Sequence, residues 1–127
     1  MKMLFFDFKE GEKSFFEENE LRDFEVEFFE NPVGWDTDLT DEQLRDTDAL
    51  CVSEVSELNE EVMRRFRNLR IVSVRHSEYK NVDMDYCRNK RIAVFHVPAE
   101  TLPDKILETA FNNIRDYCKG MHTNQVY

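Results

Sequence analysis

Residues 69–98 read LRIVSVRHSEYKNVDMDYCRNKRIAVFHVP and contain the clearest pattern in the chain. Their first part, 70–74, is a short apolar run of the kind that forms a buried strand. Asp83 can cap the short helix that follows it. A second apolar run over 91–97 predicts another strand, which Pro98 ends because proline has no N–H to donate to a sheet. A strand, a helix and a strand in this order predict two parallel strands joined by a crossover.

The same alternation of strands and helices extends to both ends of the chain. The remaining elements are predicted as strands over 2–8, 24–29 and 49–52 and as helices over 12–21, 41–46, 60–68 and 103–119. Thr40 and Gln43 form a capping box for the second of these helices, and Gly120 is placed to end the last one. Five strands alternating with five helices predict a parallel sheet covered on both faces.

Right-handed crossovers then lead to an α/β fold, a three-layer flavodoxin-like sandwich whose five-stranded parallel sheet has the order 2-1-3-4-5. We predict one such domain over 1–120. The polar residues 121–127 are predicted to form a C-terminal tail that frays.

Composition restricts the class of partner. The 127 residues include 27 acidic and 17 basic side chains, for a net charge of −10. An acidic surface repels phosphate backbones and anionic lipid, so we predict no nucleic-acid partner and no membrane binding. Cys51, Cys87 and Cys118 form no CxxC pair, which argues against a structural zinc site or a disulfide framework and fits a cytoplasmic protein. The first apolar run is broken at Asp7, too early for a signal peptide or a membrane span.

Phosphate-binding glycine loops are absent from the sequence. The three glycines lie at positions 11, 34 and 120, with no two within twenty residues of each other. Both GxGxxG and the P-loop need closely spaced glycines so that the backbone can approach phosphate. We therefore predict no cofactor for this chain.

The segment that begins at Leu69 resembles the substrate-binding domain of the D-isomer-specific 2-hydroxyacid dehydrogenases, the D-lactate dehydrogenase group especially. That family has a strand, the run Arg-Ser-Ala-Gly-Tyr-Asp-Asn-Val-Asp, a short helix, a strand ending in Val-Pro and a long helix. The positions that match this pattern are Arg75, Tyr79, Asn81, Val82, Asp83, Val97 and Pro98. The first strand and helix of the chain also fit, so the resemblance covers nearly the whole sequence.

The resemblance implies a two-domain enzyme, and this chain departs from it. Family members carry a Rossmann domain with GxGxxG and, beyond the part that matches here, a catalytic arginine, glutamate and histidine. The sequence ends at Tyr127, about where the linking helix would enter that domain, so no residue here inherits a catalytic role.

The loop after the fourth strand departs as well. In the family its small residues let backbone amides approach the substrate carboxylate. Here the segment is His76-Ser77-Glu78-Tyr79, with Glu78 at the family's glycine position. A carboxylate there both crowds and repels a carboxylate ligand. We therefore predict a degenerate substrate loop.

Two histidines and several acids follow the predicted strands. His76 and His96 come after the fourth and fifth strands, and Asp7 comes after the first, so they fall on the edge where α/β sheets bind ligands. Two histidines and a carboxylate would suit a divalent metal. Because no short-range ligand spacing supports such a site, we interpret Asp7 and His96 as rim residues and predict no metal.

The long last helix has an apolar stripe wider than one sheet face needs. Ile106, Ala110, Ile114 and Tyr117 form one line, and Phe111 belongs to an adjacent one. We predict that this helix forms a two-fold homodimer, which is the commonest way to cover such a surplus. The alternative is that these residues pack under the Phe-rich first helix of the same chain.

Two functions remain open at this point. The first hypothesis is a stand-alone, degenerate substrate domain that acts as a non-catalytic binding or interaction module, with a separate protein chain as a further partner. The alternative is one piece of a split or truncated NAD-dependent D-2-hydroxyacid dehydrogenase. On either hypothesis the chain alone is not expected to be an active enzyme.

Overall fold

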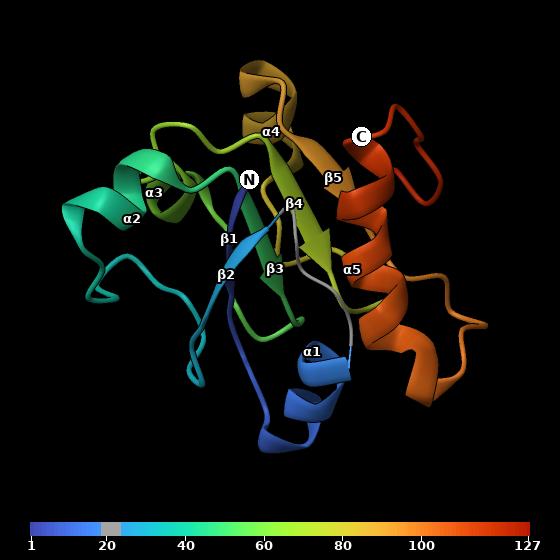
Figure 1. Ribbon diagram of the computed structural model, residues 1–127. Coiled ribbons are helices and arrows are strands. Elements are labelled where there is room, and N and C mark those ends of the chain that lie inside the picture. Colours follow the sequence, from blue (N-terminus) through green and yellow to red (C-terminus); the bar gives the residue numbers. More distant parts are fainter. Residues whose placement is uncertain (19–23) are drawn as a thin grey trace.

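The computed structural model describes residues 1–18 and 24–127 and contains one five-stranded parallel sheet (Figure 1). Its strands are β1 (Lys2–Phe5), β2 (Glu25–Phe28), β3 (Ala49–Val52), β4 (Ile71–Val74) and β5 (Ala93–Phe95). Their order is β2-β1-β3-β4-β5, and each neighbouring pair is parallel. The predicted fold class and strand order are confirmed.

The helices lie where the apolar patterns place them. They are η1 (Glu10–Glu12), α1 (Lys13–Glu18), α2 (Asp41–Asp46), α3 (Glu60–Met63), α4 (Met84–Lys90), η2 (Pro103–Lys105) and α5 (Ile106–Tyr117). The capping box is present: the Gln43 N–H donates to Thr40 Oγ1 at 3.0 Å, and the Thr40 N–H donates to Gln43 Oε1 at 2.8 Å. Asp83 caps α4 by accepting from the Tyr86 N–H at 3.0 Å. No helix in the described part of the chain is long and apolar enough to cross a membrane.

Two helices differ in extent from the prediction. The end of the helix expected over 12–21 lies outside the described residues. The helix expected over 60–68 ends at Met63, because the next N–H groups bond three residues back and the Arg67 N–H donates to the Leu44 carbonyl at 2.9 Å. A contact with a neighbouring helix therefore replaces the next helical hydrogen bond.

The core is divided by the sheet into two clusters. On one face, Leu4, Leu50, Val72 and Val94 pack with residues of α2, α3 and α4. On the other, the alternate strand residues pack with α1 and α5. This alternation follows from the two-residue repeat of a strand, and it gives the three layers that were predicted.

Helix α5 covers its apolar stripe within the chain. Ala110, Phe111 and Ile114 are fully buried. The Phe111 ring lies 5.9 Å from those of Phe15 and Phe16, so the Phe-rich first helix takes up the apparent surplus. The expectation of an exposed apolar line through Ile114 is therefore wrong. A homodimer stays a prediction, but it has lost that argument.

The prediction that residues 121–127 fray is also wrong. The Val94 N–H donates to the Tyr127 carbonyl at 3.0 Å, and the Val126 N–H donates to the Val94 carbonyl at 2.8 Å. The His96 N–H likewise donates to the Asn124 carbonyl at 3.2 Å. Because β5 is an edge strand, its outer backbone groups need partners, and this segment supplies them.

Candidate functional site

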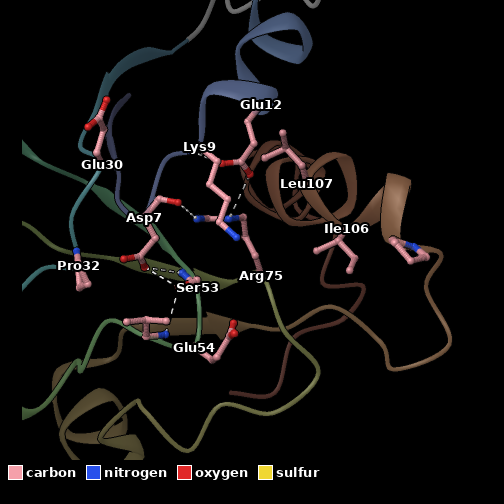
Figure 2. Close-up of a pocket in the computed structure, with 12 residues that line it drawn as sticks. Asp7, Lys9, Glu12, Glu30, Pro32, Ser53, Glu54, Arg75, Ile106 and Leu107 are labelled. Atoms are coloured by element: carbon pink, nitrogen blue, oxygen red, sulfur yellow. Dashed lines mark hydrogen bonds and ion pairs between the residues drawn. The ribbon is translucent and has the colours of Figure 1, made fainter.

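The loops that follow β1, β3 and β4 surround a pocket of about 500 Å³ at the carboxyl edge of the sheet. We call it the carboxyl-edge pocket (Figure 2). Its lining consists of Asp7, Lys9, Glu12, Glu30, Pro32, Ser53, Glu54, Val55, Arg75, Pro103, Ile106 and Leu107. The start of α5 forms one apolar wall, and charged residues form much of the rest.

Asp7 fastens the end of β1 to the loop after β3. Its backbone is left-handed, with φ of 61°, which aspartate tolerates better than most residues. Its Oδ2 accepts hydrogen bonds from the Ser53 N–H at 2.9 Å, the Ser53 hydroxyl at 2.8 Å and the Ser56 hydroxyl at 2.9 Å. Its Oδ1 is buried without a hydrogen-bond partner. The predicted rim residue thus lines the pocket, and its carboxylate is largely used to hold two loops together.

Arg75 is the buried cation of the same edge. Its Nη2 donates to the carbonyls of Phe6 at 2.8 Å and Asp7 at 3.2 Å, and its Nε lies 3.9 Å from Glu12 Oε2. The guanidinium also lies 4.1 Å from the centre of the Phe5 ring. Figure 2 shows the side chain extending from the end of β4 between Asp7 and Glu12. Most of its donors are therefore occupied inside the protein.

Cys51 lies beside that guanidinium, 3.5 Å from Sγ to Nη1. Burial raises the pKa of the Cys51 thiol, and the nearby Arg75 charge opposes that change only in part. A buried thiol with a raised pKa is not an activated nucleophile.

The predicted substrate loop lies outside the lining of this pocket. The Glu78 N–H donates to His76 Nδ1 at 3.0 Å, and the Glu78 carboxylate lies 3.5 Å from Lys80 Nζ. The positive-φ residues of the described chain do not include Glu78, so a side chain at this position costs no backbone strain. The loop is closed on itself by its own side chains.

His96 contacts the same loop. Its Nδ1 lies 2.8 Å from the Ser77 carbonyl oxygen, and its ring meets the Tyr79 ring edge-on at 5.8 Å. The Val97 N–H donates to the His76 carbonyl at 3.1 Å, so the two histidine loops are neighbours as expected. His96 does not line the carboxyl-edge pocket with Asp7. No group of three histidine, cysteine or carboxylate residues in the described chain is arranged to hold a metal.

Arg75, Ser53 and Ser56 are the contacts that sequence analysis did not assign to this site. Arg75 was noted only as a match to the family pattern. A usable signal existed, because Ser53 and Arg75 each follow a predicted strand directly, on the edge where α/β sheets place their ligands. The partners of each side chain, however, come from segments far apart in the chain.

Comparison with known families agrees with this geometry. Residues 3–102 match the D-isomer specific 2-hydroxyacid dehydrogenase, catalytic domain. The chain belongs to this family. The match contains the carboxyl-edge pocket except for its α5 wall, and the whole of the loop from His76 to Tyr79.

Solved structures of D-2-hydroxyacid dehydrogenases share the fold. D-lactate dehydrogenase from Aquifex aeolicus, complexed with NAD and lactic acid, is 23% identical with a TM-score of 0.68, and the match covers 98% of this chain and 39% of that one. D-lactate dehydrogenase from Escherichia coli in its apo form is also 23% identical with a TM-score of 0.68, over 91% and 36% of the two chains. The present chain thus spans less than half the length of these enzymes. No curated protein sequence matches it.

Proposed function

We propose that this D-2-hydroxyacid dehydrogenase catalytic domain acts as a non-catalytic binding or interaction module. The supporting observation is the closed loop from His76 to Tyr79. The family resemblance implies that amides of this loop receive the substrate carboxylate. Here the amide of Glu78 is bonded to His76 Nδ1, and the Glu78 carboxylate stands beside it.

Electrostatics adds to the obstruction. Two like charges about 4 Å apart at an effective dielectric near 20 repel by roughly 4 kcal/mol. Exposure lowers that value, because the Glu78 side chain is 60% exposed and lies near Lys80. The repulsion and the occupied amide act in the same direction, against a small carboxylate ligand.

The alternative is that the chain is one piece of a split or longer NAD-dependent D-2-hydroxyacid dehydrogenase. The observation that favours it is the coverage: the chain spans 39% of the Aquifex aeolicus enzyme. On that view a second polypeptide or segment supplies the cofactor domain, and the substrate loop binds pyruvate. A separate protein partner and a cytoplasmic location are part of both proposals.

Calorimetric titration with pyruvate tests the closed loop. We expect no binding by the unchanged chain at millimolar pyruvate, and measurable binding by the double variant His76→Ala and Glu78→Gly, which opens the amide and removes the charge. Glu100→Gly is the matched control, since it removes one exposed carboxylate after β5 without touching the loop. Binding by the unchanged chain would favour the split enzyme. Absence of binding in the double variant would show that the loop is not the cause.

A further inference from the structure

A second pocket lies at the opposite, amino edge of the sheet. Met1, Phe24 and Arg70 directly precede β1, β2 and β4, and α5 runs back along the sheet so that its last turn reaches the same end (Figure 1). Together they enclose about 760 Å³. Its lining is Met1, Phe24, Arg70, Arg115, Tyr117, Cys118, Lys119, Gly120 and His122, and we call it the amino-edge pocket.

The charge of this pocket is opposite to that of the chain. Its described lining contains Arg70, Arg115, Lys119 and His122 and no aspartate or glutamate, although the chain carries a net charge of −10. One ion pair lies at the margin, where Arg70 Nη2 is 3.4 Å from Asp48 Oδ1. Cations gathered around one concavity repel each other, and an anion bound among them relieves that repulsion.

The other side of the pocket is apolar and well supported. The Tyr117 ring is held between the rings of Phe95 at 5.6 Å and His122 at 5.5 Å. Cys118 Sγ lies 3.6 Å from Met1 Sδ, which joins the end of α5 to the start of β1. The Arg115 guanidinium lies 5.1 Å from the centre of the Phe111 ring, so its stem follows the helix surface. Cationic groups therefore face a surface suited to a flat apolar group.

We propose that the amino-edge pocket binds a small organic anion, whose phosphate or carboxylate is held by Arg70, Arg115 and Lys119 and whose apolar or aromatic body packs against Tyr117 and Phe24. Guanidinium groups match both oxyanions through paired N–H donors. The site is separate from the carboxyl-edge pocket and the closed loop, which lie at the other end of the strands. The proposal therefore does not depend on the proposed function.

Calorimetric titration of the full chain with 1-naphthyl phosphate at low ionic strength tests this proposal. We expect saturable binding that weakens as salt is added, because the contacts are charged and partly exposed. 1-Naphthoate serves as a second probe, and its affinity relative to the phosphate identifies the preferred anion. 1-Naphthol is the neutral control and should bind far more weakly.

Charge reversal locates the binding. Lys119→Glu should weaken 1-naphthyl phosphate binding by roughly tenfold, since it replaces one partly exposed attraction with a repulsion. Lys80→Glu is the matched control, an exposed lysine at the other edge with the same change in net charge, and should alter affinity by less than about twofold. Thermal unfolding of both variants checks that they are folded. Equal weakening in the two variants, equal binding of 1-naphthol, or no saturable binding by the unchanged chain would each overturn the proposal.

Discussion

Among single residues, Arg75 joins the ends of three strands. It extends from the end of β4, donates to the carbonyls of Phe6 and Asp7 after β1, and contacts Cys51 in β3. A guanidinium provides five donors in a fixed plane, so one side chain can satisfy several backbone carbonyls at once. Arg75 thus sets the shape of the carboxyl-edge pocket by holding the loops that line it.

Replacing Arg75 by methionine should lower the free energy of unfolding by about 2–4 kcal/mol, because buried carbonyls lose their donors and Glu12 loses its ion pair. Arg88→Met is the matched control. Arg88 is an exposed arginine on α4 paired with Asp85 at 3.0 Å, and its loss should cost less than about 1 kcal/mol. Urea unfolding of both variants measures the difference. Equal costs would contradict the role given to Arg75.

Local residue patterns were predictable, and long-range ones were not. The caps at Thr40 and Asp83 depend on residues three positions apart, so the sequence alone predicts them. The hydrogen bonds of Asp7 join residues 46 and 49 positions apart, and those of Arg75 span 68 and 69 positions. Only the folded sheet brings these groups together, because parallel strands end at one edge.

At the scale of elements, α5 is part of the core. It packs on β3 and β4, and the Ser73 hydroxyl donates to the Ala110 carbonyl at 2.9 Å beneath it. The width of its apolar stripe was predicted correctly, but the partner was not. The first helix supplies aromatic rings that a periodicity argument cannot assign to a particular neighbour.

Ile114→Ala should lower the free energy of unfolding by about 2–5 kcal/mol, because the side chain is fully buried and the smaller one leaves a cavity. Glu108→Ala, at an exposed position on the same helix, should change it by less than about 0.5 kcal/mol. Thermal or urea unfolding provides the comparison. A small effect at Ile114, together with a change in oligomeric state, would instead favour the α5 dimer.

For the molecule as a whole, the two buried thiols report on the intact core. Burial raises the pKa of the Cys87 thiol to about 12, and it also raises that of Cys51. Cys118 is exposed. In the folded chain at pH 8 we expect one thiol to react rapidly with a disulfide reagent and two to react only after unfolding in urea.

Alkaline pH gives the matching stability prediction. The unfolded thiols ionise near pH 9, whereas folded Cys87 stays protonated up to about pH 12. The unfolded state therefore loses protons first, and the free energy of unfolding should fall as the pH rises through this range. Rapid reaction of all three thiols in the folded chain would contradict the packing described here.

The oligomeric state also belongs to this scale. A homodimer stays a prediction, and the face it would use is restricted by burial. The large apolar side chains that remain exposed in the described chain include Trp35, Val55 and Leu102, not Ile114. Sedimentation at micromolar concentration distinguishes a 15.3 kDa monomer from a species of twice that mass.

The central claim is that this family domain is not an enzyme by itself. The sequence has three scattered glycines and no phosphate-binding loop, and the loop expected to receive substrate is closed by His76 and Glu78. The most direct test is the rate of NADH oxidation by the purified 127-residue chain in the presence of pyruvate. We predict a rate equal to that of the protein-free control. A rate that rises in proportion to the concentration of the chain, and persists through further purification, would contradict the claim.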